Sequence, residues 1–229
     1  MARVLRNLSA GSGPDLIGGD PHDCARALDV DGIAVSLVVP GAAGELVWST
    51  PGVGTALDDL QSTLGEGPTP DATRSCALVL ESDLTRVRRD RWPILLPAAI
   101  ELGVGAVFCF PLRLGGACPG VLTLHRGAVG PLSAATMDDA LIVATALTAV
   151  VLDGGARADA FADAESPTHL HRAVVHQAGG MISVQASVSV EQALVLLRAH
   201  AYRHDRPLLE VAEDVVRRRL RFAPTDGGA

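Results

Sequence analysis

The stretch Ser189-Val-Glu-Gln-Ala-Leu-Val-Leu-Leu-Arg-Ala-His-Ala201 carries the clearest structural signal in the chain. Ser189 and Gln192 have the spacing of a capping box, in which each side chain bonds the backbone N–H of the other residue, so we expect a helix from Val190. Apolar residues then recur at the three- and four-residue intervals of one helix face. They are Val190, Ala193, Leu194, Leu197 and Ala201. The pattern predicts an amphipathic helix that packs through one stripe.

Two further stripes with this spacing flank the helix. They comprise Leu170, Val174, Ala178, Met181 and Ile182 before it, and Leu208, Val211, Ala212, Val215, Val216 and Leu220 after it. Pro207 suits the first turn of the last helix, where its missing N–H has no helical partner in any case. Residues 167–223 are therefore predicted to form a small three-helix domain. A core of this size is marginal, which favours packing on a partner.

The preceding part of the chain alternates extended and helical patterns. Short apolar runs bounded by Gly- and Pro-rich turns predict strands, and apolar residues at helical spacing predict helices. The expected strands are 32–39, 45–49, 76–80, 105–112 and 120–124, and the expected helices are 56–64, 92–102 and 133–152. Strands joined by tight turns imply a mainly antiparallel sheet flanked by helices. The fold class predicted for the whole chain is α+β.

Charge divides the chain at a similar place. Met1–Glu165 holds 20 acidic residues and 11 Arg, whereas Ser166–Phe222 holds 5 acidic residues and 8 Arg. The small, polar stretch Asp153–Pro167 lies at this change of sign and suits a connector. We therefore expect an N-terminal extension (1–19), a first domain (20–153), a linker (154–166), the three-helix domain (167–223) and a tail (224–229).

Composition excludes several classes of protein. All 19 basic residues are Arg, so a Lys-dependent catalyst or a P-loop phosphate site is excluded. The four Cys show no CxxC pair and no His at metal-ligand spacing, so we expect neither a metal nor a cofactor. The first residues show no secretory signal, and the apolar run 140–152 is too short to span a bilayer. These features predict a cytoplasmic protein with no membrane segment.

Several spaced motifs in the first domain carry a family resemblance. They are Gln61-Ser-Thr-Leu-Gly-Glu-Gly-Pro68, Asp71-Ala72, Asp83-Leu84, Arg91-Trp-Pro93, Phe110-Pro-Leu112 and Gly120-Val-Leu-Thr-Leu124. Residues 20–153 thereby resemble the GAF sensor domains of actinobacterial regulators. The resemblance implies a GAF-like sheet and the sensing of a small molecule or another signal. Thr69 stands where many relatives carry Cys, which argues against a thiol-based role at that position.

Four residues of this domain are candidates for contact with a small-molecule ligand: Trp48, Glu66, Phe110 and His125. Three of them lie on expected strands, where they are able to line an apolar cavity; Phe108 and Phe110 must share one face. Packing in the core explains the same residues without a ligand, and Glu66 is equally suited to capping a helix. No Ser/His/Asp or Cys/His arrangement stands out, so we expect no catalytic residues and no enzyme.

The three-helix domain carries a second resemblance. The pattern runs through His176-Gln-Ala178, Gly180-Met-Ile182, Val188-Ser-Val-Glu-Gln-Ala193, Leu197-Arg198, Ala201, Pro207-Leu208, Val211-Ala212 and Val215-Val216. These residues resemble the ANTAR domain, an RNA-binding module of transcription antiterminators. The two resemblances together imply a GAF–ANTAR regulator. Such a protein binds paired RNA stem-loops with small loops as a homodimer, and thereby prevents an overlapping terminator from forming.

RNA loops are held through phosphate contacts and through stacking on aromatic or guanidinium planes. The residues expected to make these contacts are Arg198, which matches the basic residue of the family, and Arg172, His176, Gln177, Tyr202, Arg203 and His204. Gly179 departs from the family pattern, which has Lys between the Ala and the Gly. The missing ammonium removes a phosphate contact, and two adjacent Gly disfavour a helix. We expect Gly179→Lys to restore that contact.

Other functions remain open at this point. Two helices joined by a short turn resemble a DNA-binding helix-turn-helix, although 204–208 is not the tight Gly turn of that motif. The three-helix domain is also compatible with protein docking, and some GAF-like proteins reduce methionine sulfoxide with cysteines. Cys24, Cys76, Cys109 and Cys118 show no obvious resolving pair. The helix 133–152 is apolar on nearly all sides from 140, which predicts pairing with its counterpart in a homodimer.

Overall fold

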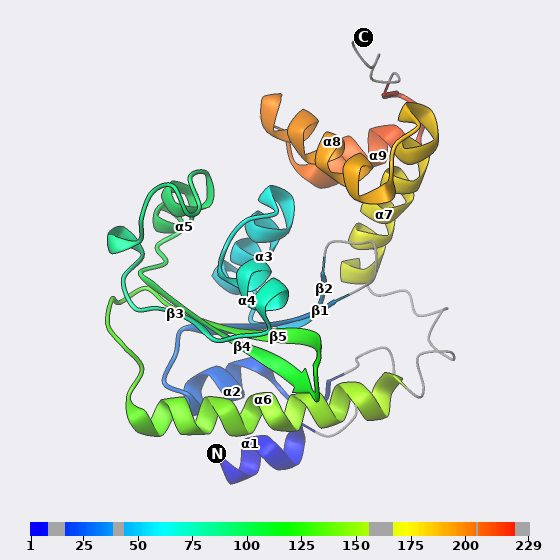
Figure 1. Cartoon of the computed structure of the whole chain (residues 1–229). Helices are drawn as coiled ribbons and strands as arrows, with labels where there is room; N and C mark the ends of the chain where they lie inside the picture. Colours follow the sequence, from blue (N-terminus) through cyan, green and yellow to red (C-terminus); the bar gives the residue numbers. More distant parts are fainter. Residues whose placement is uncertain (9–16, 39–43, 156–166, 205, 223–229) are drawn as a thin grey trace. The chain divides into compact units, whose positions relative to one another are not determined.

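The computed structural model describes residues 1–8, 17–38, 44–155, 167–204 and 206–222, without the side chains of 154–155, 167–173, 176 and 191. The chain divides into two compact units, one with α1 to α6 and all five strands, the other with α7 to α9 (Figure 1). The linker expected at 154–166 and the tail at 224–229 lie almost wholly outside the described residues.

The first unit is built on an antiparallel sheet. Its strands are β1 (Gly32–Leu37), β2 (Glu45–Ser49), β3 (Val79–Glu81), β4 (Ala106–Leu114) and β5 (Ala117–Arg126), in the spatial order β2-β1-β5-β4-β3. The two longest strands, β4 and β5, are joined by the pair Gly115 and Gly116. Gly115 has a φ of +57°, which the tight hairpin turn requires and which favours glycine. The antiparallel sheet expected from the sequence is confirmed.

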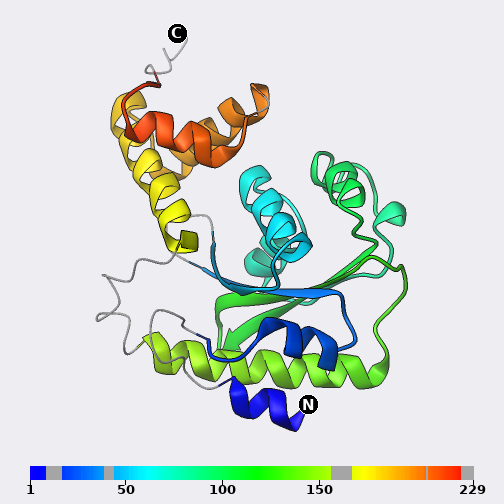
Figure 2. The same ribbon diagram turned by 180° about the vertical axis from the view of Figure 1, so that it is seen from behind.

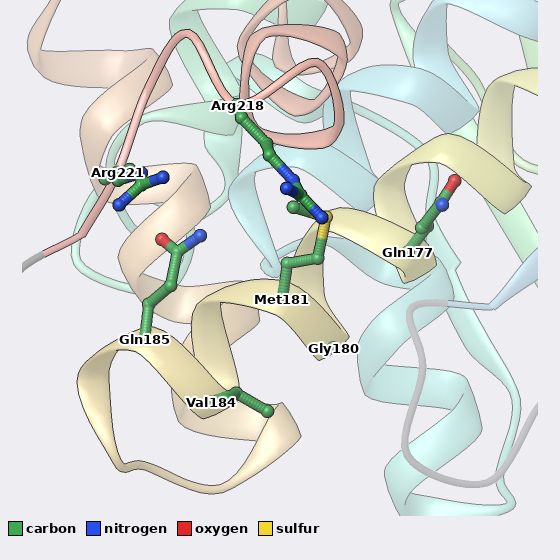
Figure 3. Close-up of a pocket in the computed structure, with 7 residues that line it drawn as sticks. All are labelled: Gln177, Gly180, Met181, Val184, Gln185, Arg218 and Arg221. Atoms are coloured by element: carbon green, nitrogen blue, oxygen red, sulfur yellow. The ribbon is translucent and has the colours of Figure 1, made fainter.

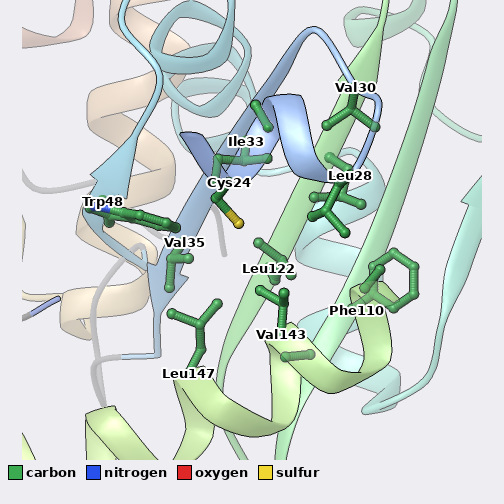
Figure 4. Packing of buried hydrophobic residues seen from close by; sticks show 14 of the residues in the cluster. Cys24, Leu28, Val30, Ile33, Val35, Trp48, Phe110, Leu122, Val143 and Leu147 are labelled. Atoms are coloured by element: carbon green, nitrogen blue, oxygen red, sulfur yellow. The ribbon is translucent and has the colours of Figure 1, made fainter. Parts of the chain in front are cut away.

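One face of the sheet is covered by α1 (Ala2–Asn7), α2 (Pro21–Ala27) and α6 (Ala134–Gly155), as the two opposite views show (Figures 1 and 2). Alternate strand residues point to this face because side chains alternate along a strand. Val143 and Leu147 of α6 belong to the same core as Val35, Phe110, Leu122 and Trp48 (Figure 4). Val4, Leu8 and Ile17, from the expected N-terminal extension, are also buried in this core.

The opposite face is covered by α3 (Val53–Leu64), α4 (Pro68–Ser75) and α5 (Leu95–Glu101), and the short helix η1 (Leu84–Arg86) precedes α5 (Figure 1). The second core lies here and combines strand residues with helix residues. Its members include Leu57, Trp92, Leu95, Leu96 and Val107. The sheet is therefore buried on both faces, with a helical layer on each side.

Several expected element boundaries were wrong, among them the starts of β3 and α5. The strand expected at 76–80 begins only at Val79, because 68–75 form α4 and Cys76 ends that helix with a φ of +49°. The helix expected from Trp92 begins at Leu95, because the Glu66 carboxylate accepts hydrogen bonds from the backbone N–H groups of Ile94 and Leu95 at 2.8 and 2.7 Å. A carboxylate in this position satisfies N–H groups that have no partner within the helix.

The second unit consists of α7 (Pro167–Ala186), α8 (Val190–Arg203) and α9 (Leu208–Val216). The capping box is present: Ser189 accepts from the N–H of Gln192, whose side chain accepts from the N–H of Ser189. Pro207 lies one position before its expected place, as the residue preceding α9. The core joins Ala178, Ile182, Leu197, Val211 and Val215 from the three expected stripes. All its members are apolar.

Helix α6 is long and apolar enough to cross a membrane by length and composition alone, with a mean hydropathy of 1.7 over its most apolar window. In the structure it is a core helix, because Ala140, Val143 and Leu147 are fully buried against the first core. Leu141, Ile142 and Leu152 are 41–48% exposed and form a separate stripe along the same helix. The helix therefore has one face used by its own unit and one apolar face without a partner in the described part of the chain.

Candidate functional site

The residues expected to contact RNA lie at different depths in the second unit. Gln177 is exposed on α7, and Tyr202, Arg203 and His204 are exposed at the C-terminal end of α8. Arg198 is partly buried on α8. Arg172 and His176 lie on α7, but their side chains are outside the described residues. The surface available to a ligand therefore includes Gln177 and the end of α8.

Gly179 is placed differently from our expectation. It is buried, and a Cβ at this position would lie 3.0 Å from Cδ2 of Leu194 on α8. Residue 179 therefore faces the neighbouring helix α8. The absence of a Lys here removes no charge from an exposed face of α7. Gly180 is exposed and a Cβ there would meet nothing within 4 Å. The two adjacent glycines thus serve different purposes, and only Gly179 allows α7 and α8 to approach closely.

Arg198 is a cation without an ion-pair partner among the described residues. Its Nε atom is buried and forms no hydrogen bond, and no ion pair joins the guanidinium to any described residue. Burial lowers the pKa of Arg198 from its usual value, because removal from water disfavours the charged form. A half-buried, unpaired guanidinium is unfavourable on its own. A phosphate that reached it would supply the missing partner.

The C-terminal end of α8 carries a cluster of rings and cations. The rings of His200 and His204 are 4.3 Å apart between centroids, and the ring of Phe222 lies edge-on to His200 at 5.4 Å. Burial, reinforced by His204, Arg206 and Arg203, lowers the pKa of His200. Positive charge at this end of a helix is favourable in itself. The cluster also offers stacking surfaces beside cations, which are the groups that bind single-stranded RNA.

A groove of about 530 Å³ lies beside this cluster, between α7 and the segment that follows α9. Gln177, Gly180, Met181, Val184 and Gln185 line it from α7, and Arg218 and Arg221 line it from the other side (Figure 3). The Gln185 side chain accepts a hydrogen bond from the backbone N–H of Phe222 at 3.0 Å, which holds the segment against α7. The sequence did not reveal the groove, because its sides are 40 residues apart in the chain.

The four ligand candidates of the first unit do not form one site. Trp48 and Phe110 are buried in the core beneath α2 and α6, and the Trp48 indole N–H donates to the Gly19 carbonyl at 3.1 Å. His125 is buried in the strand β5, one residue from Leu124 of that core, and so points to the opposite face. Glu66 caps α5. Each of these residues has a structural role.

His125 packs tightly against two glycines. A Cβ on Gly32 would lie 2.2 Å from its Cε1 atom, and a Cβ on Gly54 would lie 3.5 Å away. Burial lowers the pKa of His125, and the carboxylate of Asp31 opposes this effect. His125 is therefore held neutral by a close-packed setting.

A buried polar network lies between the sheet and the helices α3 and α4, and sequence patterns did not point to it. The Ser36 hydroxyl donates to Asp58 at 2.5 Å, and the N–H of Thr69 donates to the Gln61 carbonyl oxygen at 2.8 Å. Thr69 also bonds Thr123 at 2.8 Å. The Gln61 Nε2 atom is buried without a hydrogen-bond partner among the described residues. A buried amide donor with no acceptor is costly, so this network is the best candidate for a ligand site in the first unit.

The matched motif residues around Trp92 hold the α4–α5 region together. Asp71 accepts from the Trp92 indole N–H at 3.1 Å and pairs with Arg91 at 3.3 Å. Arg91 also pairs with Glu81 and lies over the Trp92 ring, 4.3 Å from its centroid. The arrangement places α4 over the buried polar network. Asp71 therefore orders this region.

The cysteines form one close pair that the sequence did not indicate. Cys118 donates to the Gly120 carbonyl at 3.2 Å and is close enough to Cys76 for that thiol to raise its pKa. Burial raises the pKa of Cys24 and of Cys109 to about 12, and burial together with Cys76 raises the pKa of Cys118 to about 11. Thiols with such pKa values are poor nucleophiles at neutral pH. No group of three potential ligands among the described residues is arranged to hold a metal ion.

Comparison with known proteins finds a similar domain for each of the two units. Residues 168–216 match the ANTAR domain. The first unit is similar in fold to the GAF domain of an Acinetobacter phosphoenolpyruvate-protein phosphotransferase, with a TM-score of 0.51, 16% identity, and coverage of 68% of this chain and 92% of that chain. The GAF domain of the Coxiella burnetii phosphoenolpyruvate-protein phosphotransferase gives a TM-score of 0.50 with 14% identity, covering 69% of this chain and 96% of that chain. No curated protein matches the sequence.

The chain therefore has a GAF–ANTAR arrangement, in which a unit with the GAF fold precedes an ANTAR domain. The similarity of the first unit to GAF domains concerns the fold alone, because the sequence identities are only 16% and 14%. The ANTAR match rests on sequence, and its residues 168–216 cover nearly all of the helices α7 to α9.

Proposed function

We propose that this protein is an RNA-binding transcription antitermination regulator of the cytoplasm, whose GAF unit senses a signal and controls the ANTAR domain. The observation that carries the proposal is the ANTAR match over residues 168–216, within a region, residues 166–222, that holds 8 Arg and 5 acidic residues. The unpaired Arg198 and the cluster of His200, Arg203 and His204 supply phosphate and stacking contacts. The RNA partner is a pair of stem-loops with small loops.

Crosslinking in the native host tests this proposal. Ultraviolet crosslinking of the intact protein, followed by sequencing of the bound nucleic acid, should recover RNA segments with paired stem-loops that overlap terminators. RNase treatment should remove the signal. Recovery of duplex DNA instead would favour the DNA-binding alternative, and recovery of neither nucleic acid would favour protein docking.

We also propose that the protein acts as a homodimer through α6. Leu141, Ile142 and Leu152 form an exposed apolar stripe, while the opposite side of the same helix is buried in its own core. Paired stem-loops require two RNA-binding domains at once, and a dimer provides them. Light scattering at micromolar concentration should give twice the chain mass of 23.6 kDa. A strict monomer would contradict the proposal.

For the sensor unit we propose a small polar ligand at the buried network of Ser36, Asp58, Gln61, Thr69 and Thr123. The unpartnered Gln61 Nε2 atom calls for a hydrogen-bond acceptor, such as a carbonyl or carboxylate oxygen. Thermal unfolding followed by tryptophan fluorescence would test a panel of small metabolites that carry such oxygens. Both Trp residues lie in this unit, so the fluorescence reports it alone. A ligand of this network should raise the unfolding midpoint, and the Gln61→Glu variant should respond less.

One observation supports testing the alternative of a thiol-dependent reductase: Cys76 lies close to Cys118. Thiol-dependent turnover of methionine sulfoxide by the purified protein tests it directly. The raised pKa of Cys118 argues that turnover will be absent, since the thiolate is the reactive form. Turnover that disappears in Cys118→Ser would overturn this conclusion.

A further inference from the structure

The groove between α7 and the segment after α9 has two chemically distinct sides. The α7 side is apolar at its centre, where Met181 is partly exposed and Val184 is 82% exposed. The other side carries the guanidinium groups of Arg218 and Arg221, and the Arg218 side chain extends toward Met181 (Figure 3). Among the described residues that line the groove, none is acidic. This is the composition of a site for a flat, partly apolar group that carries negative charge beside it.

The arginines after α9 fall into two pairs. Arg217 pairs with Glu213 at 3.0 Å, and Arg219 approaches Asp214 at 3.9 Å, so both are partly neutralised by α9 itself. Arg218 and Arg221 form no ion pair with any described residue, and both line the groove. The positive charges of Arg218 and Arg221, on the groove side, therefore have no ion pair among the described residues. Those of Arg217 and Arg219 are partly compensated by α9.

The backbone at Arg218 places its side chain in this position. Helix α9 ends with bonds from the N–H groups of Arg219 and Leu220 back to the Asp214 carbonyl, and Arg218 has a φ of +60°. Glycine is the usual residue at such a left-handed helix end. An arginine at this position accepts an unfavourable backbone conformation, and its side chain lines the groove.

We propose that this groove holds an unpaired base of an RNA loop, with the phosphates on either side of the base held by Arg218 and Arg221. Met181 and Val184 provide the apolar floor for the base, and the Gln177 amide lies at the edge of the groove to bond it. Both guanidinium groups lie beyond residues 168–216, the part of the chain that matches the ANTAR domain. The inference rests on the proposed RNA-binding function and adds a site made by residues outside that match.

Binding measurements on the full chain test the site. A pool of labelled RNAs with two hairpins and randomised loops is first selected on the wild-type protein, and the selected RNA is then used for fluorescence anisotropy. The double variant Arg218→Gln/Arg221→Gln should bind at least tenfold more weakly at low salt. Its slope of log affinity against log salt should be shallower by about 1.4, since each phosphate contact to a single strand contributes about 0.7.

A matched variant controls for overall charge. Arg217→Gln/Arg219→Gln removes the same two charges from the same segment, but these side chains face Glu213 and Asp214. Its affinity should fall less than threefold. A second pair of variants tests the apolar floor of the groove. Val184→Asp should weaken RNA binding strongly, whereas the control Val195→Asp, at a 59% exposed position on α8, should not. Both valines are exposed enough for the variants to fold.

The possible outcomes distinguish a failure of the proposed groove site from a failure of the proposed RNA-binding function. If no RNA is selected by the wild-type protein, the RNA-binding function and the groove site both fall. If RNA is selected and the two arginine double variants bind it equally, the function stands and the groove site is wrong. If Val184→Asp leaves RNA affinity unchanged, a base does not occupy the groove, and this surface serves protein docking instead. Crosslinking of a 4-thiouridine in the loop to the peptide 177–185 would support the site.

Discussion

The two units of this chain treat polar groups in opposite ways. The GAF unit buries a network of Ser36, Asp58, Gln61, Thr69 and Thr123 between its sheet and helices. In the described part of the ANTAR unit no polar or charged residue is fully buried, and the Arg side chains are exposed or partly buried. The first arrangement suits a ligand that enters a protein core, and the second suits a polyanion that binds an outer face. The difference is consistent with the proposed roles, sensing for the first unit and RNA binding for the second.

The largest effect we expect contrasts two faces of α6. Leu147 is fully buried in the core of the GAF unit, whereas Ile142 is 48% exposed on the stripe proposed for dimerisation. Leu147→Glu should destabilise the unit by at least about 4 kcal/mol, because it buries an unpaired charge. Ile142→Glu should change the stability of the unit by only about 0.5 kcal/mol or less but dissociate the dimer.

Urea unfolding followed by tryptophan fluorescence measures the first effect, and light scattering measures the second. Leu147→Glu is thus unsuitable as a test of dimerisation, although the sequence alone placed Leu147 among the residues of the dimer helix. A dimer that persists in Ile142→Glu would remove the stripe as the interface.

The next effect concerns the buried network. Thr69→Val keeps the shape of the side chain but removes the hydroxyl that bonds Thr123 at 2.8 Å. We expect a loss of about 1–2 kcal/mol in the stability of the GAF unit, because the Thr123 hydroxyl loses a buried partner. Tryptophan fluorescence should show this loss, while Tyr202, the single Tyr of the chain, should report no change in the ANTAR unit. An equal shift of both signals would contradict the independence of the two units.

A smaller effect separates the two glycines of α7. Gly180→Ala should stabilise the ANTAR unit by about 0.5–1 kcal/mol, because helix propensity improves and the new Cβ meets open space. Gly179→Ala should gain less, since its Cβ would lie 3.0 Å from Leu194. Circular dichroism during urea unfolding compares the two. An equal gain at both positions would show that α8 yields freely to a side chain at 179, and Gly179→Lys would then again be a reasonable way to add a phosphate contact.

The smallest effect is a pH dependence in the GAF unit. Burial lowers the pKa of His125, so the unfolded chain binds a proton at this residue before the folded chain does. Stability should therefore be complete above the ordinary histidine pKa of about 6.5 and fall as the pH drops through the lower folded pKa. His125→Gln should flatten this part of the pH profile of the tryptophan-detected midpoint. A profile unchanged by the substitution would show that His125 titrates normally in the folded unit.

Sequence patterns predicted the regular elements well where the signal was local. The capping box at Ser189 and Gln192 placed the start of α8 correctly, and the three helical stripes gave the core of the ANTAR unit. The start of α5 was missed because its cap, Glu66, lies 29 residues from Leu95 in the chain. Helix α4 was missed because its short sequence of small and polar residues has prolines at 68 and 70 and no apolar stripe.

The candidate sites were less predictable, because they depend on which residues meet in three dimensions. Residue type indicated Gln177 and Arg203, but not that Gly179 faces Leu194. It could not distinguish Arg218 from Arg217, since the pairing with Glu213 is decided by the turn at the end of α9. The proximity of Cys76 and Cys118 and the unpartnered Gln61 amide likewise arise only from the packing of α4 on the sheet.

Terminator read-through in a purified single-round transcription assay tests the central claim most directly. The template carries the stem-loop pair most enriched by crosslinking in the native host, upstream of its own terminator. We predict that the wild-type protein increases read-through, and that a template in which one loop of the pair is replaced no longer responds. Read-through that is the same with and without the protein, on a template whose RNA the protein binds, would contradict antitermination as its function.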